Sequence, residues 1–124
     1  MNLTVIAAGA WGTAQAIAFS GHHRVTLLTN EEAVALEMRA TRENKRYLPG
    51  FMLAESIRIS TDFIAAVTDA DLVVIATPLA GLRSTLRQLR SMGAEQKPLL
   101  WVCKGFEAGS AKLPHQIHAE EIGK

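Results

Sequence analysis

The sequence predicts a doubly wound α/β fold with a mostly parallel sheet, and three observations support this prediction. Short apolar runs alternate with segments of helical periodicity along the chain. The strand-like runs are almost continuously apolar, as expected when a parallel sheet is covered on both faces. The connections are short, and a glycine-bearing turn joins the first strand to the first helix. In such a sheet, ligands bind beyond the carboxyl ends of the strands.

Each element is predicted by its own local pattern. Apolar, β-branched runs indicate strands, and apolar residues three or four positions apart indicate helices. The polar segment 41–50 ends in a Pro-Gly turn signal and is expected to be an irregular connection or a frayed helix end. The expected elements are a strand at 3–6, a helix through Phe19, a strand at 25–28, a helix from a cap at 30–32 to about Arg39, a strand at 57–60, a brief helix capped by Asp62, a strand at 72–76, a longer helix from Leu79 to Met92, a strand at 99–103 and the start of a helix at 113–122.

The longer helix is amphipathic. Its leucines fall on one side, and Arg83, Arg87 and Arg90 fall on another. We expect these arginines to form a solvated face.

The composition favours a single domain that binds small molecules. The chain has 124 residues, is 48% hydrophobic and carries a formal charge of +1, which argues against a strongly basic nucleic-acid binder and an acidic disordered tail. The one cysteine, Cys103, cannot form an internal disulfide, and the N-terminus enters a strand directly. A cytoplasmic protein is therefore expected. No apolar run approaches the roughly 20 residues that cross a bilayer.

The turn after the first strand has the arrangement that holds a dinucleotide pyrophosphate. Unpaired N–H groups in a first helical turn attract phosphate oxygens where glycine lets the backbone come close. The usual pattern is G-x-G-x-x-G, and here Ala7, Gly9 and Gly12 stand at its three glycine positions. The βαβ context favours dinucleotide binding by Gly9, Ala10, Trp11 and Gly12 over simple helix packing. Ala7 fits if its φ is negative and crowds the crossover if the position needs the freedom of glycine.

The position that would contact the adenosine ribose lies about 20 residues beyond the turn. Thr29 and Asn30 occupy it, and Glu31 comes one residue late. Neither residue is the carboxylate that favours NAD or the arginine that pairs with the 2′-phosphate of NADP, so the choice between these cofactors stays open. Asn30 either contacts the ribose, caps the second helix, or does both.

Other candidate residues have both a functional and a structural interpretation. Trp11 could shield the cofactor or pack on neighbouring loops, and a mixed role is expected. Lys104 follows a buried strand, where it could attract a phosphate, polarise a carbonyl or be an ordinary surface lysine. Cys103 is expected to be a small buried hydrophobe rather than a nucleophile. His115 and His118 share a helix face without further ligands nearby, so no metal site is expected.

Three motifs, taken in order, resemble the N-terminal portion of bacterial NAD(P)-dependent glycerol-3-phosphate dehydrogenase. The resemblance extends through essentially all of the chain, although that family is considerably longer. The motifs are Ala8-Gly9-Ala10-Trp11-Gly12-Thr13-Ala14, Glu43-Asn44-Lys45-Arg46-Tyr47-Leu48-Pro49-Gly50 and Cys103-Lys104-Gly105-Phe106-Glu107.

This resemblance implies that residues 1–124 form an incomplete N-terminal dinucleotide-binding domain with a Rossmann-type sheet. The implied reaction is reversible hydride transfer between NAD or NADP and sn-glycerol 3-phosphate, giving dihydroxyacetone phosphate for phospholipid synthesis. Trp11 and its turn would contact the pyrophosphate, and Lys104 would touch both cofactor and substrate. The general-base lysine would belong to a helical C-terminal domain, so no catalytic residue is expected here. The partner expected from the resemblance is the small-molecule substrate, and a homodimer is expected for the full-length protein; the low net charge argues against nucleic-acid partners.

The sequence departs from that family at two places. Alanine replaces glycine at position 7, and Leu28-Thr29-Asn30 replaces a longer stretch that usually carries an arginine near the ribose. Loss of that arginine predicts a weakened preference for NADP. The alternatives are a hydroxyacid-type or ketopantoate-type dehydrogenase, a non-enzymatic nucleotide-sensing or interaction module, and a domain that Ala7 prevents from binding any nucleotide.

Overall fold

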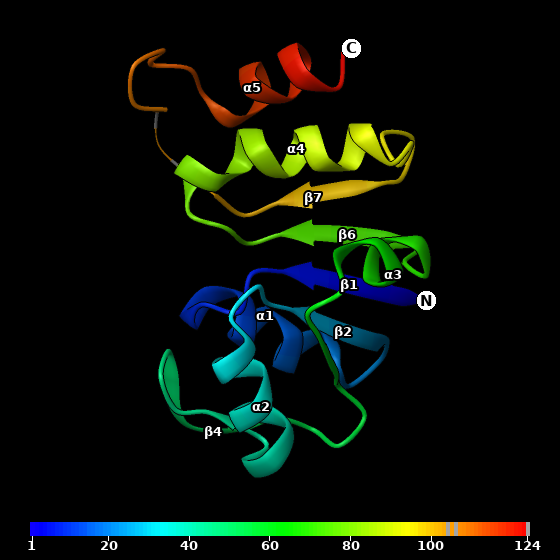
Figure 1. Ribbon diagram of the computed structural model, residues 1–124, viewed down its shortest axis with the longest axis vertical. Helices are drawn as coiled ribbons and strands as arrows, with labels where there is room; N and C mark the ends of the chain where they lie inside the picture. The colour runs from blue at the N-terminus through cyan, green and yellow to red at the C-terminus, as the bar shows by residue number, and fades with distance from the viewer. Residues whose placement is uncertain (104, 106, 124) are drawn as a thin grey trace.

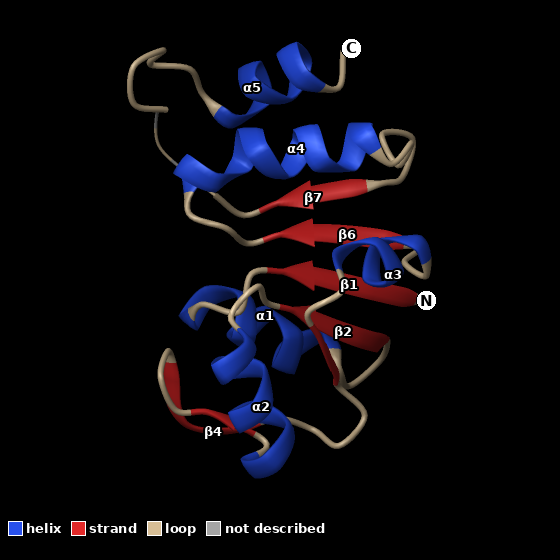
Figure 2. Ribbon diagram, viewed as in Figure 1, coloured by secondary structure: helices blue, strands red, loops and turns tan. Residues whose placement is uncertain are grey.

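The computed structural model describes residues 1–103, 105 and 107–123, and it contains a five-stranded sheet with helices on both faces (Figures 1 and 2). The strand order is β5-β2-β1-β6-β7 and every neighbouring pair is parallel, which confirms the predicted doubly wound fold. The elements are β1 Asn2–Ile6, α1 Ala10–Phe19, β2 Arg24–Leu28, α2 Glu32–Thr41, β3 Glu43–Asn44, β4 Leu48–Met52, β5 Arg58–Ser60, α3 Phe63–Thr68, β6 Leu72–Ile75, the 3-10 turn Leu79–Gly81, α4 Leu82–Ser91, β7 Leu99–Trp101 and α5 Pro114–Glu121.

The strands are apolar on both faces because each face packs against helices. Leu3 and Val5 of β1 join a cluster with residues of α1 and α2. Ile6 belongs to the opposite cluster, which is built with α3, α4 and α5. Thr4, which stands between Leu3 and Val5 in β1, is also buried, and its hydroxyl donates a hydrogen bond of 2.7 Å to the Ala66 carbonyl of α3. Alternate side chains of one strand therefore stabilise two separate helical layers.

The segment after α2 forms a β-hairpin, which corrects the expectation of an irregular connection or frayed helix end for 41–50. Helix α2 ends at Thr41 because Arg42 adopts a left-handed conformation with φ +56°. Strands β3 and β4 then pair antiparallel with an irregular register. Gly50 takes φ +90° in β4, and its N–H donates to the Glu43 carboxylate at 2.9 Å. These tertiary and side-chain contacts override the weak local signals.

Several element boundaries differ from the expected ones. Glu31, not Asn30, is the N-cap of α2, and its side chain makes no capping hydrogen bond within the described part of the chain, so the capping alternative for Asn30 is wrong. The cap expected of Asp62 is confirmed, because its carboxylate accepts from Ala65 N–H at 3.1 Å. Helix α4 begins at Leu82, after a 3-10 turn, and strand β7 stops at Trp101. Among the described residues, no helix is long and apolar enough to cross a membrane.

Arg83 does not belong to a solvated face, contrary to the expectation. Its guanidinium forms a pair of hydrogen bonds with Glu107, at 2.8 and 2.9 Å, and contacts Glu120 and Glu121 of α5 at 2.7 Å each. Its side chain is 19% exposed, whereas those of Arg87 and Arg90 are 62% and 52% exposed, as expected. Both of these arginines still reach Glu121. These hydrogen bonds and ion pairs therefore hold α5 and the segment at Glu107 against α4.

This network predicts a loss of stability in acid. The Arg83 guanidinium lowers the pKa of Glu107 from 4.5 to about 2, and Arg87 and Arg83 lower that of Glu121. A carboxyl with a lowered pKa in the folded state stabilises the fold fully above its unfolded pKa. This stabilisation is lost as the pH falls from about 4.5 to about 2. Urea titrations across this range should show a shallower decline for Arg83→Met than for the unmodified chain.

Arg58→Met is the matched control, because its ion pair with Asp69 spans 3.9 Å between side chains that are 73% and 68% exposed. That variant should keep the pH dependence of the unmodified chain, since exposed pairs contribute little. Parallel pH curves for the Arg83→Met variant and the unmodified chain would contradict the role given to the network.

Candidate functional site

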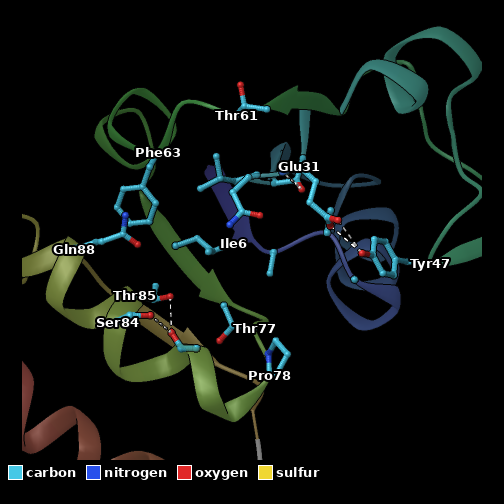
Figure 3. Close-up of a pocket in the computed structure, with 17 residues that line it drawn as sticks. Ile6, Glu31, Tyr47, Thr61, Phe63, Thr77, Pro78, Ser84, Thr85 and Gln88 are labelled. Carbon is cyan, nitrogen blue, oxygen red and sulfur yellow. Dashed lines mark hydrogen bonds between the residues drawn. The ribbon is translucent and has the colours of Figure 1, made fainter. Parts of the chain in front are cut away.

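A crevice of about 630 Å³ lies at the carboxyl ends of the strands (Figure 3). Its walls come from the segments that follow β1, β2, β5 and β6, together with the start of α4 and Tyr47 of the hairpin. The strand order reverses between β1 and β6, and this is the point where open α/β sheets bind their ligands. Its volume is within the range typical of small-molecule sites.

The glycine turn forms one wall of this crevice and leads into α1. The first intrahelical bond runs from Thr13 N–H to the Gly9 carbonyl, so the N–H groups of residues 10–12 lie before the hydrogen-bond ladder. A Cβ added to Gly9 would have no neighbouring atom of the described residues within 4 Å, apart from those adjacent in the chain. A Cβ added to Gly12 would lie 1.9 Å from the Ala7 carbonyl oxygen and 3.2 Å from the Ala76 Cβ. Gly12 thus permits close helix packing, and Gly9 leaves the turn open toward the crevice.

Ala7 adopts φ +87°, a conformation that favours glycine. Of the two alternatives that the sequence left open for Ala7, the structure has the unfavourable one, in which the position needs the conformational freedom of glycine. The residue is held there by its N–H, which donates to the Leu28 carbonyl at 2.9 Å, and by the close approach of α1 to its own carbonyl. The turn keeps its shape, but the alanine methyl group adds steric strain.

Ala7→Gly should therefore stabilise the fold. Removing the steric strain of an alanine with positive φ stabilises the folded state by about 1–2 kcal/mol. Glycine also increases the conformational entropy of the unfolded chain, which opposes this gain by about 0.5–1 kcal/mol. We expect a net gain of about 0.5–1 kcal/mol in urea unfolding. Ala8→Gly is the matched control because Ala8 is 5% exposed and is not among the residues with positive φ, and it should lower stability. A loss in both variants would show that Ala7 is unstrained.

Asn44 connects the glycine turn to the hairpin. Its side chain is fully buried, and the amide nitrogen donates to the Ala8 carbonyl and to Thr13 Oγ1, each at 2.8 Å. Its amide oxygen accepts from Tyr47 N–H at 3.2 Å. A buried amide is stable only when its polar atoms are paired, and here both ends are. Asn44 therefore fixes the turn, the first helix and the hairpin relative to one another.

Tyr47 and Glu31 meet at the side of the crevice that follows β2 (Figure 3). The Tyr47 hydroxyl donates to the Glu31 carboxylate, with oxygen–oxygen distances of 3.0 and 2.9 Å. Asn30 and Thr29 line the same side. Sequence reasoning did not identify Tyr47 and Glu31 as site residues. The spacing from the glycine turn pointed to Thr29 and Asn30, one residue before Glu31. Tyr47 could be placed at the crevice only once its segment was known to be a hairpin.

Thr77 lies across the crevice, after β6 (Figure 3). Its hydroxyl is buried beside the Cys103 thiol, a weak hydrogen-bonding group, and has no stronger partner among the described residues. A buried hydroxyl without a strong partner is uncommon. A polar ligand spanning the crevice would meet the open glycine turn on one side and this hydroxyl on the other.

The remaining candidates are placed as follows. Trp11 is 55% exposed, so packing on neighbouring loops accounts for less than half of its surface. Burial raises the pKa of the Cys103 thiol, which fits the expected inert residue. The ring of His118 packs against that of Trp101, with centroids 5.1 Å apart. No group of three metal-binding side chains occurs in the described part of the chain. Lys104 lies outside the described residues.

Comparison with known proteins gives the relationship of the chain. Residues 2–124 match the family model described as the NAD-dependent glycerol-3-phosphate dehydrogenase N-terminus. The chain is 57% identical to glycerol-3-phosphate dehydrogenase [NAD(P)+] of Dechloromonas aromatica, covering all of this chain and 37% of that protein. It is 48% identical to the enzyme of the same name from Aromatoleum aromaticum, over 99% of this chain and 37% of that protein.

Solved structures point to the same family as these sequence relatives. The crystal structure of glycerol-3-phosphate dehydrogenase from Coxiella burnetii superposes with a TM-score of 0.89 at 27% identity, over 99% of this chain and 38% of that one. A 2-dehydropantoate 2-reductase from Enterococcus faecalis, at 16% identity and a TM-score of 0.63, shares the fold alone. The chain spans about 37% of the length of the curated relatives above. Because the family model covers nearly every residue, the chain belongs to the family of NAD-dependent glycerol-3-phosphate dehydrogenase N-terminal domains.

Proposed function

We propose that this chain is the cofactor-binding portion of an oxidoreductase that interconverts sn-glycerol 3-phosphate and dihydroxyacetone phosphate with NAD or NADP. The observation that supports it best is the crevice at the point where the strand order reverses, bounded by an open glycine turn. The reaction is proposed from membership of the family, because the relatives reported above are named glycerol-3-phosphate dehydrogenase [NAD(P)+].

The residues present suit a dinucleotide. Gly9, Ala10, Trp11 and Gly12 stand at the start of α1, where N–H groups and the helix dipole favour a pyrophosphate. The residues after β2, Thr29 to Glu31, line the crevice and would contact the adenosine ribose. The Thr77 hydroxyl, which has no strong partner among the described residues, would offer a hydrogen bond to the part of the ligand that crosses to β6.

The bound cofactor would supply a carbon that accepts hydride from the carbinol carbon of the substrate and returns it in the reverse direction. This chain would bind and orient the cofactor, and by resemblance Lys104 would touch both cofactor and substrate. By the same resemblance, the group that takes up the carbinol proton belongs to the helical C-terminal domain of the longer family members. The chain alone should therefore bind cofactor without turnover.

Titration of the 124-residue chain with NADH and NADPH, followed by nicotinamide fluorescence, tests the binding role. Binding of at least one nucleotide is expected, together with no reduction of dihydroxyacetone phosphate by the chain alone. Detectable reduction would contradict the division of roles, and a folded chain that binds neither nucleotide would contradict the function itself. A change of oligomeric state with NADH, without activity even in the full-length protein, would instead indicate a sensing module.

Two expectations about the whole protein stay predictions. The first is a homodimeric full-length enzyme, which sedimentation analysis of that protein would test. The second is a cytoplasmic location without nucleic-acid partners.

A further inference from the structure

We infer that Glu31 makes this site select NAD over NADP by placing a carboxylate where the adenosine ribose would lie. The inference concerns the cofactor site proposed above and therefore rests on that function. It goes beyond the family relationship: the family model is named for NAD and the matched enzymes for both nucleotides, and neither name assigns a residue to the choice between them. It also reverses the conclusion from sequence spacing that Glu31 lies one residue too far along the chain.

The backbone places Glu31 at the crevice. Its N–H donates to Thr29 Oγ1 at 3.1 Å, and its carbonyl accepts the first hydrogen bond of α2, from Ala35 N–H at 3.0 Å. Both bonds hold the residue at the boundary between β2 and α2, roughly 20 residues beyond the glycine turn. A carboxylate at this boundary is the group that accepts a hydrogen bond from a ribose 2′-hydroxyl in dinucleotide-binding folds.

The hairpin fixes the carboxylate and leaves it able to accept further bonds. The Tyr47 hydroxyl supplies one proton to the two carboxylate oxygens, at 3.0 and 2.9 Å. An ionised carboxylate has about four acceptor positions, so the others stay available to ribose hydroxyls. Tyr47 is itself held through its N–H by the buried Asn44. The carboxylate is thus oriented before any ligand arrives.

The charge of the lining decides between the two cofactors. Among the described residues that line the crevice, Glu31 alone carries a formal charge. NADP differs from NAD by a 2′-phosphate, which a carboxylate at this position would repel and which no described lining cation would pair with. Arg46, the hairpin cation next to Tyr47 in the sequence, is exposed, and its guanidinium carbon lies 5.5 Å from the centre of the Tyr47 ring, outside the lining.

The test measures the dissociation constants of NADH and NADPH for the 124-residue chain and its Glu31→Gln variant at fixed, moderate salt. The variant keeps the size of the side chain and an oxygen that can accept from Tyr47, and it removes the charge. The unmodified chain should bind NADH more tightly than NADPH. Glu31→Gln should reduce this preference by about tenfold, mainly through tighter NADPH binding.

Glu32→Gln is the matched control. It removes the same charge one residue later, from an exposed side chain in the first turn of α2 that does not line the crevice. It should leave the NADH/NADPH ratio unchanged. Arg46→Gln tests the neighbouring cation and should change the ratio less than Glu31→Gln. Thermal melts followed by circular dichroism show that each variant is folded.

Several results would overturn the inference. Tighter binding of NADPH by the unmodified chain would do so, as would a ratio that Glu31→Gln leaves unchanged or that Glu32→Gln shifts equally. In these cases a nucleotide still binds, so the proposed function stands. Failure of the folded, unmodified chain to bind either nucleotide is a different result, because it removes the proposed function and the selectivity with it.

Discussion

Gly12→Ala should strongly destabilise the fold of this chain. The added methyl group would lie 1.9 Å from the Ala7 carbonyl oxygen, which is backbone and cannot rotate away as a side chain can. Helix α1 would have to move off β1, disrupting the cluster that buries Val5 and Ala16. We expect a loss of roughly 3 kcal/mol or more, measured by urea unfolding or seen as loss of soluble protein.

Gly9→Ala is the control for this prediction. The position has φ −73°, and an added Cβ would have no neighbouring atom of the described residues within 4 Å, so its stability cost should be about 1 kcal/mol or less. Its methyl group would instead occupy the open side of the turn, and under the proposed function it should weaken nucleotide binding in a folded protein. Equal destabilisation by the two substitutions would show that the contact with Ala7 is not the cause.

Asn44→Ala should be the second most damaging change. It removes three hydrogen bonds of a fully buried side chain and leaves the Ala8 carbonyl and the Tyr47 N–H without this partner. Unpaired buried groups and the new cavity together cost about 2–4 kcal/mol. Chemical denaturation should show this loss, and nucleotide affinity should fall at temperatures where the variant remains folded.

Asn30→Ala provides the comparison for stability. Asn30 is exposed, so its removal should change the free energy of unfolding by less than about 0.5 kcal/mol. If Asn44→Ala proved equally mild, water would be replacing the lost amide, and the turn and hairpin would not depend on this residue.

Apolar patterning was sufficient to predict the strands of the parallel sheet, and the glycine pattern predicted the turn after the first strand. Runs such as Leu72 to Ile75 are strands in the structure because both faces of a parallel sheet are buried, and that burial is visible as an unbroken apolar sequence. The role of Gly12 follows from the same logic, since helix and strand meet at a fixed distance in every such unit.

The hairpin and its contacts could not be predicted from local patterns. Strand β3 has only two residues, so its pairing depends on contacts with distant residues rather than on its own propensity. The role of Asn44 requires knowing that the Ala8 carbonyl faces it, and the role of Arg83 requires knowing that α5 brings two glutamates to α4. The left-handed Ala7 violates a local preference, which only the packing around it explains.

The bonds of Asn44 have a consequence for engineering this domain. Its amide nitrogen contacts the turn that would receive the phosphates, and its oxygen holds Tyr47, which orients Glu31 near the expected sugar. The turn and the hairpin are therefore one transferable unit, although more than 30 residues separate them in the chain. A chimera that grafts the glycine turn without the hairpin should lose the orientation of the sugar-binding carboxylate, whereas exchange of both segments together should retain it.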